Sequence, residues 1–358
     1  ETIATLNFNG GTLSQGGATL NLASAVTALS MRNTTIAGNL AITSGGAVVF
    51  DPTNNGTATI SGNINLNALT TVFNIGDGTA DTDMLISGIV SNGALSKTGA
   101  GTLVLSGANT YGGGTLVSSG ILQGNSSSLQ GLITNNATLV FDQNISGNYL
   151  SSISGAGTFV KNGSGTLILT NANNVGTSFV NEGTLIVNGT LGGGGLMTVA
   201  SGASLRGNGT ITKDLTINGI LSPGNSIGTL NLLGNQTFGA TSILQNELNP
   251  INSDLVNIVG SLQIQPGASL QVLPDPGTYT TPFTYTIIQT TAGVTGTFST
   301  ITNSMPLLQM SVFSDGLNVF LQLTGFVPFS ELVTHGNAAK VAHCLDELSS
   351  PPGSDLAL

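Results

Sequence analysis

A pentapeptide in the second half of the chain has the spacing of a serine nucleophile. Residues 224–228 read GNSIG, which matches the G-x-S-x-G pattern of nucleophile elbows. Such a serine needs a strand-to-helix turn, a downstream acid and a histidine. Here a further strand-like stretch follows the pentapeptide, and the two histidines, His335 and His343, lie in the terminal segment. We therefore interpret Ser226 as part of a structural turn.

Three aspartates crowd one short segment. Asp77, Asp81 and Asp83 lie at alternating or nearly alternating positions, and carboxylates so placed can share a calcium ion. The segment lacks the D-x-D-x-D-G series of EF-hands and the calcium-binding nonapeptide of β-helices. We predict solvated turn carboxylates and keep calcium binding as the alternative.

The remaining candidates for chemistry are sparse. His335, His343 and Cys344 do not have the C-x₂₋₄-C or H-x₃₋₅-H spacing of zinc sites. A lyase-like, carbohydrate-active β-helix enzyme would need clustered aspartates beside a basic residue, yet Arg32 and Arg206 are isolated. The chain also has no Trp, and aromatic residues make up 5% of it, which leaves few platforms for stacking sugars. We expect no catalytic residue, no metal and no cofactor, with that enzyme class as the alternative.

Composition narrows the class of protein. Only 6% of the 358 residues are charged, against about 25% in ordinary globular proteins. The net charge is −10 with 6 Lys and Arg in total, so no cluster of cations is available for a nucleic-acid partner. The single cysteine excludes an intrachain disulfide framework. The abundance of Gly (51 residues) beside Ser, Thr and Asn favours strands and tight turns.

Two segments of the chain are versions of the same sequence. Residues 95–125 align with residues 159–189, so that Lys97 matches Lys161 and Asn109 matches Asn173, 64 positions apart. Repeated units rich in strands and turns are typical of solenoids.

Short alternating strands separated by Gly and Asn turns continue for more than 300 residues without a linker-like break. A β-sandwich closes at about 100 residues, and two-sheet folds rarely exceed about 250. We therefore predict an all-β fold, a right-handed parallel β-helix (solenoid) in which Leu, Ile and Val point inward and stack on their counterparts one coil away. Glu1 begins in the middle of this pattern, so we expect any targeting signal upstream.

The sequence pattern and composition change toward the C-terminus. Residues 241–323 contain longer strands and more Pro and Tyr, and Ser314-Asp315-Gly316 is a hairpin signal. We predict a β-rich capping module at 241–323, after a β-helix stem at 1–240. In the linker at 324–358, residues 331–348 are predicted to form a short helix that presents Val341, Cys344, Leu345 and Leu348 on one face and stops at residues 351–353.

With these patterns established, the chain resembles the passenger domain of a bacterial autotransporter (type V secretion). The texture K-x-G-x-G-T-L-x-L-x-x-x-N of the passenger-associated transport repeat is matched by Lys97 to Asn109 and by Lys161 to Asn173. Four further stretches carry the resemblance. Residues 73–88 and 207–238 resemble the family in general, residues 253–298 resemble the late passenger region called the autochaperone, and residues 337–348 resemble the helical connector before the translocator barrel.

The resemblance implies a non-enzymatic, surface-exposed stalk or adhesin that folds outside the outer membrane of a Gram-negative bacterium, with its C-terminal module as folding template. Its expected partner is its own translocator β-barrel, which lies outside this chain. Further expected partners are a host-cell surface or extracellular matrix, or like chains side by side in a surface layer or filament. We expect no nucleic-acid partner.

Overall fold

The computed structural model describes residues 1–358 except 15, 54–55, 334, 350–355 and 358. It divides into two compact units, Glu1–Leu196 and Met197–Leu358, which we describe separately.

The described residues of the first unit form 23 strands. They are β1 (Thr2–Ile3), β2 (Leu6–Leu13), β3 (Thr19–Leu22), β4 (Thr27–Ile36), β5 (Asn39–Ile42), β6 (Ala47–Phe50), β7 (Ala58–Ile60), β8 (Ile64–Ile75), β9 (Met84–Ile86), β10 (Val90–Thr98), β11 (Thr102–Leu105), β12 (Thr115–Val117), β13 (Ile121–Gly124), β14 (Ile133–Asn135), β15 (Thr138–Asp142), β16 (Gly147–Tyr149), β17 (Ile153–Ser154), β18 (Thr158–Asn162), β19 (Thr166–Leu169), β20 (Ala172–Asn174), β21 (Ser178–Val180), β22 (Thr184–Val187) and β23 (Thr190–Gly192).

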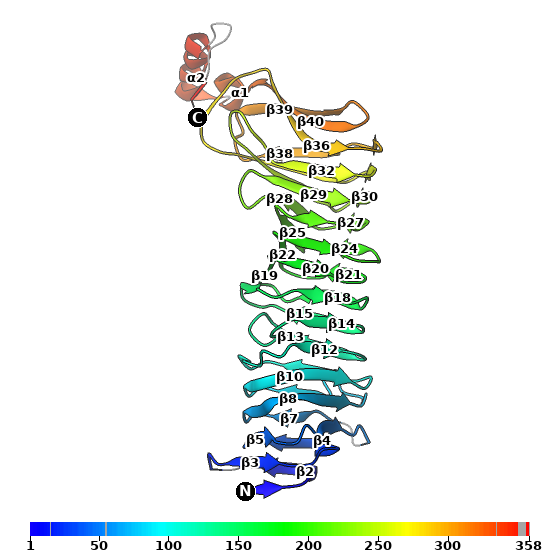
Figure 1. Ribbon diagram of the computed structural model, residues 1–358. Coiled ribbons are helices and arrows are strands. Elements are labelled where there is room, and N and C mark those ends of the chain that lie inside the picture. Colours follow the sequence, from blue (N-terminus) through cyan, green and yellow to red (C-terminus); the bar gives the residue numbers. More distant parts are fainter. Residues whose placement is uncertain (15, 54–55, 334, 350–355, 358) are drawn as a thin grey trace. The chain divides into compact units, whose positions relative to one another are not determined.

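Each of these strands pairs in parallel with a strand one coil away, so successive coils stack (Figure 1). The register aligns like residues: Met84, Leu103, Leu122, Leu139 and Phe159 follow one another on neighbouring strands, and each is fully buried. In β11, buried leucines alternate with half-buried Thr102 and Val104. Removal of these inward ladders from water stabilises the stack. The predicted parallel β-helix is confirmed.

The second unit contains the remaining elements. They are β24 (Met197–Val199), β25 (Ser204–Gly207), β26 (Thr210–Ile211), β27 (Leu215–Ile217), β28 (Ile220–Pro223), β29 (Thr229–Leu233), β30 (Gln236–Phe238), β31 (Ile243–Leu248), β32 (Leu255–Val259), β33 (Leu262–Ile264), β34 (Ser269–Pro274), β35 (Thr278–Tyr279), β36 (Phe283–Thr290), β37 (Val294–Thr295), β38 (Thr300–Asn303), β39 (Leu308–Ser314), β40 (Asn318–Phe326), α1 (Phe329–Leu332), α2 (Gly336–Ser349) and β41 (Leu356–Ala357).

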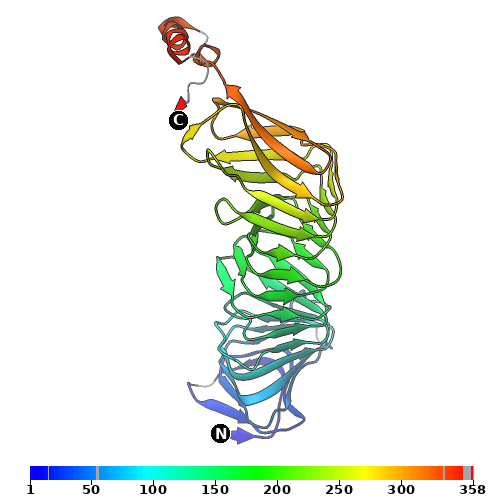
Figure 2. The same cartoon turned by 45° about the horizontal axis from the view of Figure 1, so that its top comes forward.

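Parallel stacking continues in this unit and then changes direction. Leu205, Leu221, Leu244 and Leu270 form a buried ladder like that of the first unit. The strand β36 pairs in parallel with β32 but antiparallel with β40, and β39 completes an antiparallel hairpin (Figure 2). This is the hairpin that the sequence predicted.

Asp315 builds the turn of that hairpin. Its Oδ1 accepts hydrogen bonds from the amides of Leu317 (2.9 Å) and Asn318 (2.7 Å), and Gly316 has a φ of 95°. The buried side chains of β40 are Val319, Leu321 and Leu323.

The terminal helical segment differs from its prediction. In place of one helix over 331–348, the structure has α1 and α2, separated where Val333 is extended and Gly336 has a φ of 76°. The break brings Asp346 back to α1, where its carboxylate accepts hydrogen bonds from the amides of Phe329 and Ser330. The predicted stop at 351–353 lies outside the described residues. No described helix is long and apolar enough to cross a membrane.

Candidate functional sites

The G-x-S-x-G segment is a turn between two strands. It joins β28 to β29, whereas a nucleophile elbow leads into a helix. Gly224 has a φ of 81°, and a Cβ there would lie 1.9 Å from the carbonyl oxygen of Ser226, so only glycine fits. Ser226 therefore lies in a turn between two strands, as the sequence predicted, and the absence of a nucleophilic role stays a prediction.

A buried aspartate that the sequence did not single out holds this turn. The carboxylate of Asp254 accepts hydrogen bonds from the amides of Gly228 and Glu247, both at 2.8 Å. Burial raises the pKa of Asp254 to about 7, although both amides oppose that shift. The neighbouring Glu247 carboxylate lies 3.9 Å from the Arg206 guanidinium. This cluster ties together β25, β31 and the turn before β29.

The aspartates of the predicted calcium or solvated-turn segment separate in the structure. Asp77 and Asp81 are exposed, but Asp83 is fully buried. The Asp83 carboxylate accepts hydrogen bonds from the amides of Gly78 (2.7 Å) and Thr102 (2.8 Å). The prediction of a solvated carboxylate is therefore wrong for Asp83, because a second coil covers it and supplies a donor. Among the described residues, no three His, Cys, Asp or Glu side chains are grouped to hold a metal ion.

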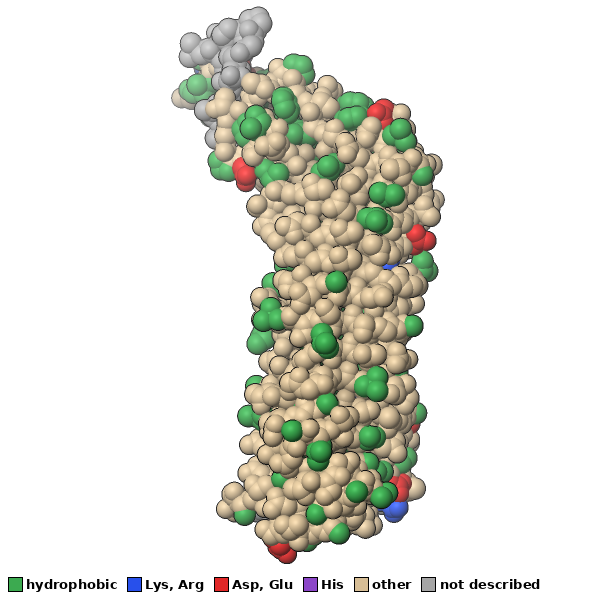
Figure 3. All heavy atoms as spheres, viewed as in Figure 1, with side chains coloured by type: hydrophobic (Ala, Val, Ile, Leu, Met, Phe, Trp, Pro, Cys, Tyr) green, Lys and Arg blue, Asp and Glu red, His purple; other side chains and the backbone are tan. Residues whose placement is uncertain are grey.

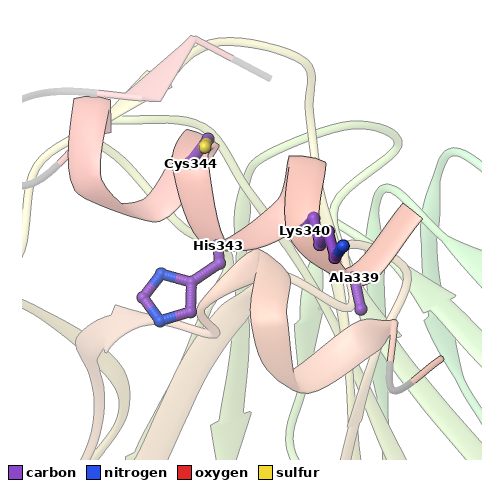
Figure 4. A pocket seen from close by; sticks show the side chains of 4 residues that line it. All are labelled: Ala339, Lys340, His343 and Cys344. Atoms are coloured by element: carbon purple, nitrogen blue, oxygen red, sulfur yellow. The ribbon is translucent and has the colours of Figure 1, made fainter. Parts of the chain in front are cut away.

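A hollow of about 480 Å³ lies on α2. It is lined by Ala339, Lys340, His343 and Cys344, whose side chains do not converge on one point (Figure 4). The predicted apolar face of this helix is open to solvent, with Val341 58% and Leu345 43% exposed; the side chain of Leu348 lies outside the described residues. The thiol of Cys344 is free and exposed.

The two repeat blocks place a lysine inside the solenoid. Lys97 and Lys161 are fully buried. The Lys97 Nζ donates to the carbonyl oxygens of Thr98 (2.9 Å), Gly99 (2.9 Å) and Ser119 (3.1 Å). Burial lowers the pKa of Lys97 to about 8, and the nearby Asp83 charge partly offsets this.

The second block repeats this arrangement. The Lys161 Nζ donates to the carbonyl oxygens of Asn162 (2.9 Å), Gly163 (2.7 Å) and Glu182 (3.1 Å). Burial lowers the pKa of Lys161 to about 8, as it does for the buried Lys213 of the second unit. The alignment of Lys97 with Lys161 was the only sequence signal for these sites.

The outer surface offers shallow, weakly charged hollows. One of about 330 Å³ is lined by residues from several coils of the first unit, among them the small residues Ala94 and Gly114 and the larger Leu116 and Leu132. On the face shown in Figure 3, hydrophobic side chains are scattered and charged side chains are few. Such a surface suits contacts made by shape and hydrogen bonding rather than by strong electrostatic attraction.

Comparisons with known proteins agree with this architecture. Residues 95–123 and 159–187 match the passenger-associated-transport-repeat family. Over 197 residues, half of this chain, it is 34% identical to the Adhesin BmaC autotransporter of Brucella suis biovar 1 (strain 1330). Over 217 residues, 56% of this chain, it is 29% identical to an extracellular serine protease of Serratia marcescens. The matches cover 6% and 20% of the lengths of those relatives.

A β-solenoid that carries two passenger-associated transport repeats fits the passenger domain of an autotransporter. The resemblance seen in the sequence is thereby confirmed. The relatives imply that this chain is part of a secreted or surface-displayed protein.

Proposed function

We propose that this chain is a non-enzymatic stem of an autotransporter passenger, displayed on or released from the cell surface. The observation that carries the proposal is that the residues shared by the two repeats are used inside the solenoid. Lys97 and Lys161 bind backbone carbonyls, and Asn109 and Asn173 bind backbone groups of neighbouring strands. The residues shared by the two repeats therefore stabilise the stacking of the coils.

The route to the surface follows from the class of protein. An autotransporter passenger crosses the outer membrane of a Gram-negative bacterium through its own translocator β-barrel, which we propose as the first partner of this chain. We further propose that the C-terminal module, 241–323, acts as the folding template. Its last strands form an antiparallel hairpin on a parallel stack, which gives the growing solenoid a defined end.

An adhesive role is supported by the name of one relative and by the surface. The Adhesin BmaC autotransporter matches half of this chain. The hollow beside Leu116 and Leu132, whose lining also includes Thr70 and Thr134, is the surface that we propose contacts a host-cell surface, extracellular matrix or a second copy of this chain. A binding assay of the purified chain on immobilised matrix proteins, with Leu132→Ser as a surface variant, tests the first two partners.

The second relative makes a serine protease the competing function. The turn around Ser226 argues against that activity in this chain, because Asp254 binds the turn's backbone. We expect a fluorophosphonate probe to label the purified chain no more than its Ser226→Ala variant. Labelling that disappears in Ser226→Ala would overturn the non-enzymatic assignment.

A further inference from the structure

The repeat lysines occupy positions that apolar residues fill elsewhere in the same ladders. In the register of the strands, Lys97 of β10 lies between Phe73 of β8 and Val117 of β12. Lys161 of β18 likewise lies between Phe141 of β15 and Val180 of β21. Each ammonium group therefore replaces one apolar rung, flanked by a phenylalanine one coil before it and a valine one coil after it.

Each ammonium group joins two coils. Two of its three acceptors follow it directly in the chain, Thr98 and Gly99 for Lys97. The third, the carbonyl oxygen of Ser119, belongs to the next coil, and the Ser119 hydroxyl donates back to the carbonyl oxygen of Gly99 at 3.2 Å. The equivalent third acceptor of Lys161 is Glu182, again one coil onward. The third contact therefore exists only when the next coil is docked.

The repeat asparagines add a second bridge. The Asn109 side chain accepts a hydrogen bond from the amide of Val90 (2.7 Å) in the preceding coil and donates to the carbonyl oxygen of Ser128 (2.7 Å) in the following one. Asn173 accepts from the amide of Ile153 (3.0 Å) in the preceding coil and donates within its own coil to Asn171. The two blocks thus share the lysine bridge forward and the asparagine bridge backward.

We propose that Lys97 and Lys161 are inter-coil latches, which couple each repeat coil to the next so that the two coils open together. In a solenoid, stability is approximately a sum of intrinsic coil terms and nearest-neighbour interfaces. Opening one interface removes one hydrogen-bond acceptor from a buried ammonium group. A buried polar group without a hydrogen-bond partner raises the free energy of the structure. An apolar side chain at the same rung would fill the space but leave carbonyl oxygens at two corners without their donor.

Hydrogen exchange of the purified chain tests the latch. We compare the wild type with Lys97→Met, Lys161→Met and the control Lys340→Met, which alters an exposed lysine on α2. In Lys97→Met, amides of residues 118–124 should exchange at least about tenfold faster, while those of 181–187 keep their wild-type rates; Lys161→Met should give the reverse pattern. Unchanged rates, or equal acceleration in both segments, would overturn the proposal.

A measurement on the wild type keeps the proposal testable if a methionine variant does not fold. In native-state exchange at increasing denaturant, residues 95–98 and 118–124 should show the same opening free energy and the same denaturant dependence. The same should hold for residues 159–162 and 181–187. If residues 118–124 open well before residues 95–98, the lysine does not couple the two coils.

Discussion

Burying a lysine removes an ammonium ion from water, and the chain does this with three of its four lysines: Lys97, Lys161 and Lys213. Burial opposes the charged form, so it lowers the pKa of each to about 8. For Lys97 and Lys161, three backbone carbonyls replace the lost water. Although the chain has few charged residues, it places these lysines in its interior, and we therefore assign them a role in stabilising the fold.

A glycine beside the first lysine gives a residue-scale test. Gly120 has a φ of 69°, and a Cβ there would lie 2.4 Å from the carbonyl oxygen of Gly99 and 2.7 Å from the Lys97 Nζ. Gly120→Ala should lower the free energy of unfolding by about 1–3 kcal/mol, through backbone strain and displacement of the ammonium group.

The matched control is Gly112→Ala, because a Cβ at Gly112 meets nothing within 4 Å. It should change the free energy of unfolding by no more than about 0.5 kcal/mol in the same denaturant titration. Equal effects of the two substitutions would mean that the corner of the first repeat is not tightly constrained.

Asp254 makes stability depend on pH. Its pKa is about 7 in the folded chain, mainly because of burial, against 3.8 as the reference value. Between these values the folded state binds more protons than the unfolded state, so this group's contribution to stability is complete below about pH 4 and is lost as the pH rises through 7. The charges facing it are Glu247 and Arg206.

We therefore expect the wild type to lose stability relative to Asp254→Asn as the pH rises from 4 to 7. Denaturant titrations across this range measure the difference, with the exposed Asp77→Asn as a control for loss of one acidic group. A difference between wild type and Asp254→Asn that stays constant with pH would contradict the assignment.

At the residue scale, the sequence predicted which residues of the two repeats are equivalent better than it predicted which polar side chains are buried. The 64-residue spacing correctly identified Lys97 and Lys161 as equivalent residues of the two repeats. The sequence of an alternating strand does not show, however, whether a polar residue in it faces inward. Asp83 was expected in solvent for the same reason. Its partner Thr102 is 19 positions away, and only the coil register brings the two together.

The strands and helices were predicted from the sequence more accurately than the burial of single polar residues. Period-two alternation with Gly turns predicted the strands and their parallel stacking, because each inward leucine needs an apolar neighbour one coil away. The C-terminal helix was predicted as one piece, since its apolar periodicity does not show a break. The N-terminus of α1 is held by Asp346, which follows it by 16 or 17 residues.

The hairpin at the end of the second unit provides the element-scale prediction. Leu321 is fully buried on β40, whereas Thr324 on the same strand is exposed. Leu321→Asp places an unpaired charge in the core and should cost more than about 3 kcal/mol locally. If the C-terminal module is the folding template, refolding of the whole chain after dilution from denaturant should also slow markedly.

The control for this experiment is Thr324→Asp, which adds the same charge at an exposed position of β40. It should leave both protease resistance of residues 308–326 and the refolding rate close to wild type. A Leu321→Asp chain that loses its hairpin yet refolds at the wild-type rate would refute the template role while leaving the fold intact.

At the scale of the whole molecule, each unit is a stack in which every coil contacts its neighbours, and the chain has one cysteine and no Trp. Such a chain can fold by successive addition of coils, and no intrachain disulfide has to form first. These properties suit a protein that crosses a membrane unfolded and folds afterwards. They support the proposed passenger role, and the relatives that match this chain include an autotransporter adhesin by name.

The most direct test of that role is to locate the chain on intact producing cells. Mild protease treatment followed by peptide mapping should release peptides from residues 1–323 without lysis, while a periplasmic marker protein stays uncut. Peptides from this chain that are recovered only after the cells are lysed would contradict the account and place the solenoid inside the cell envelope.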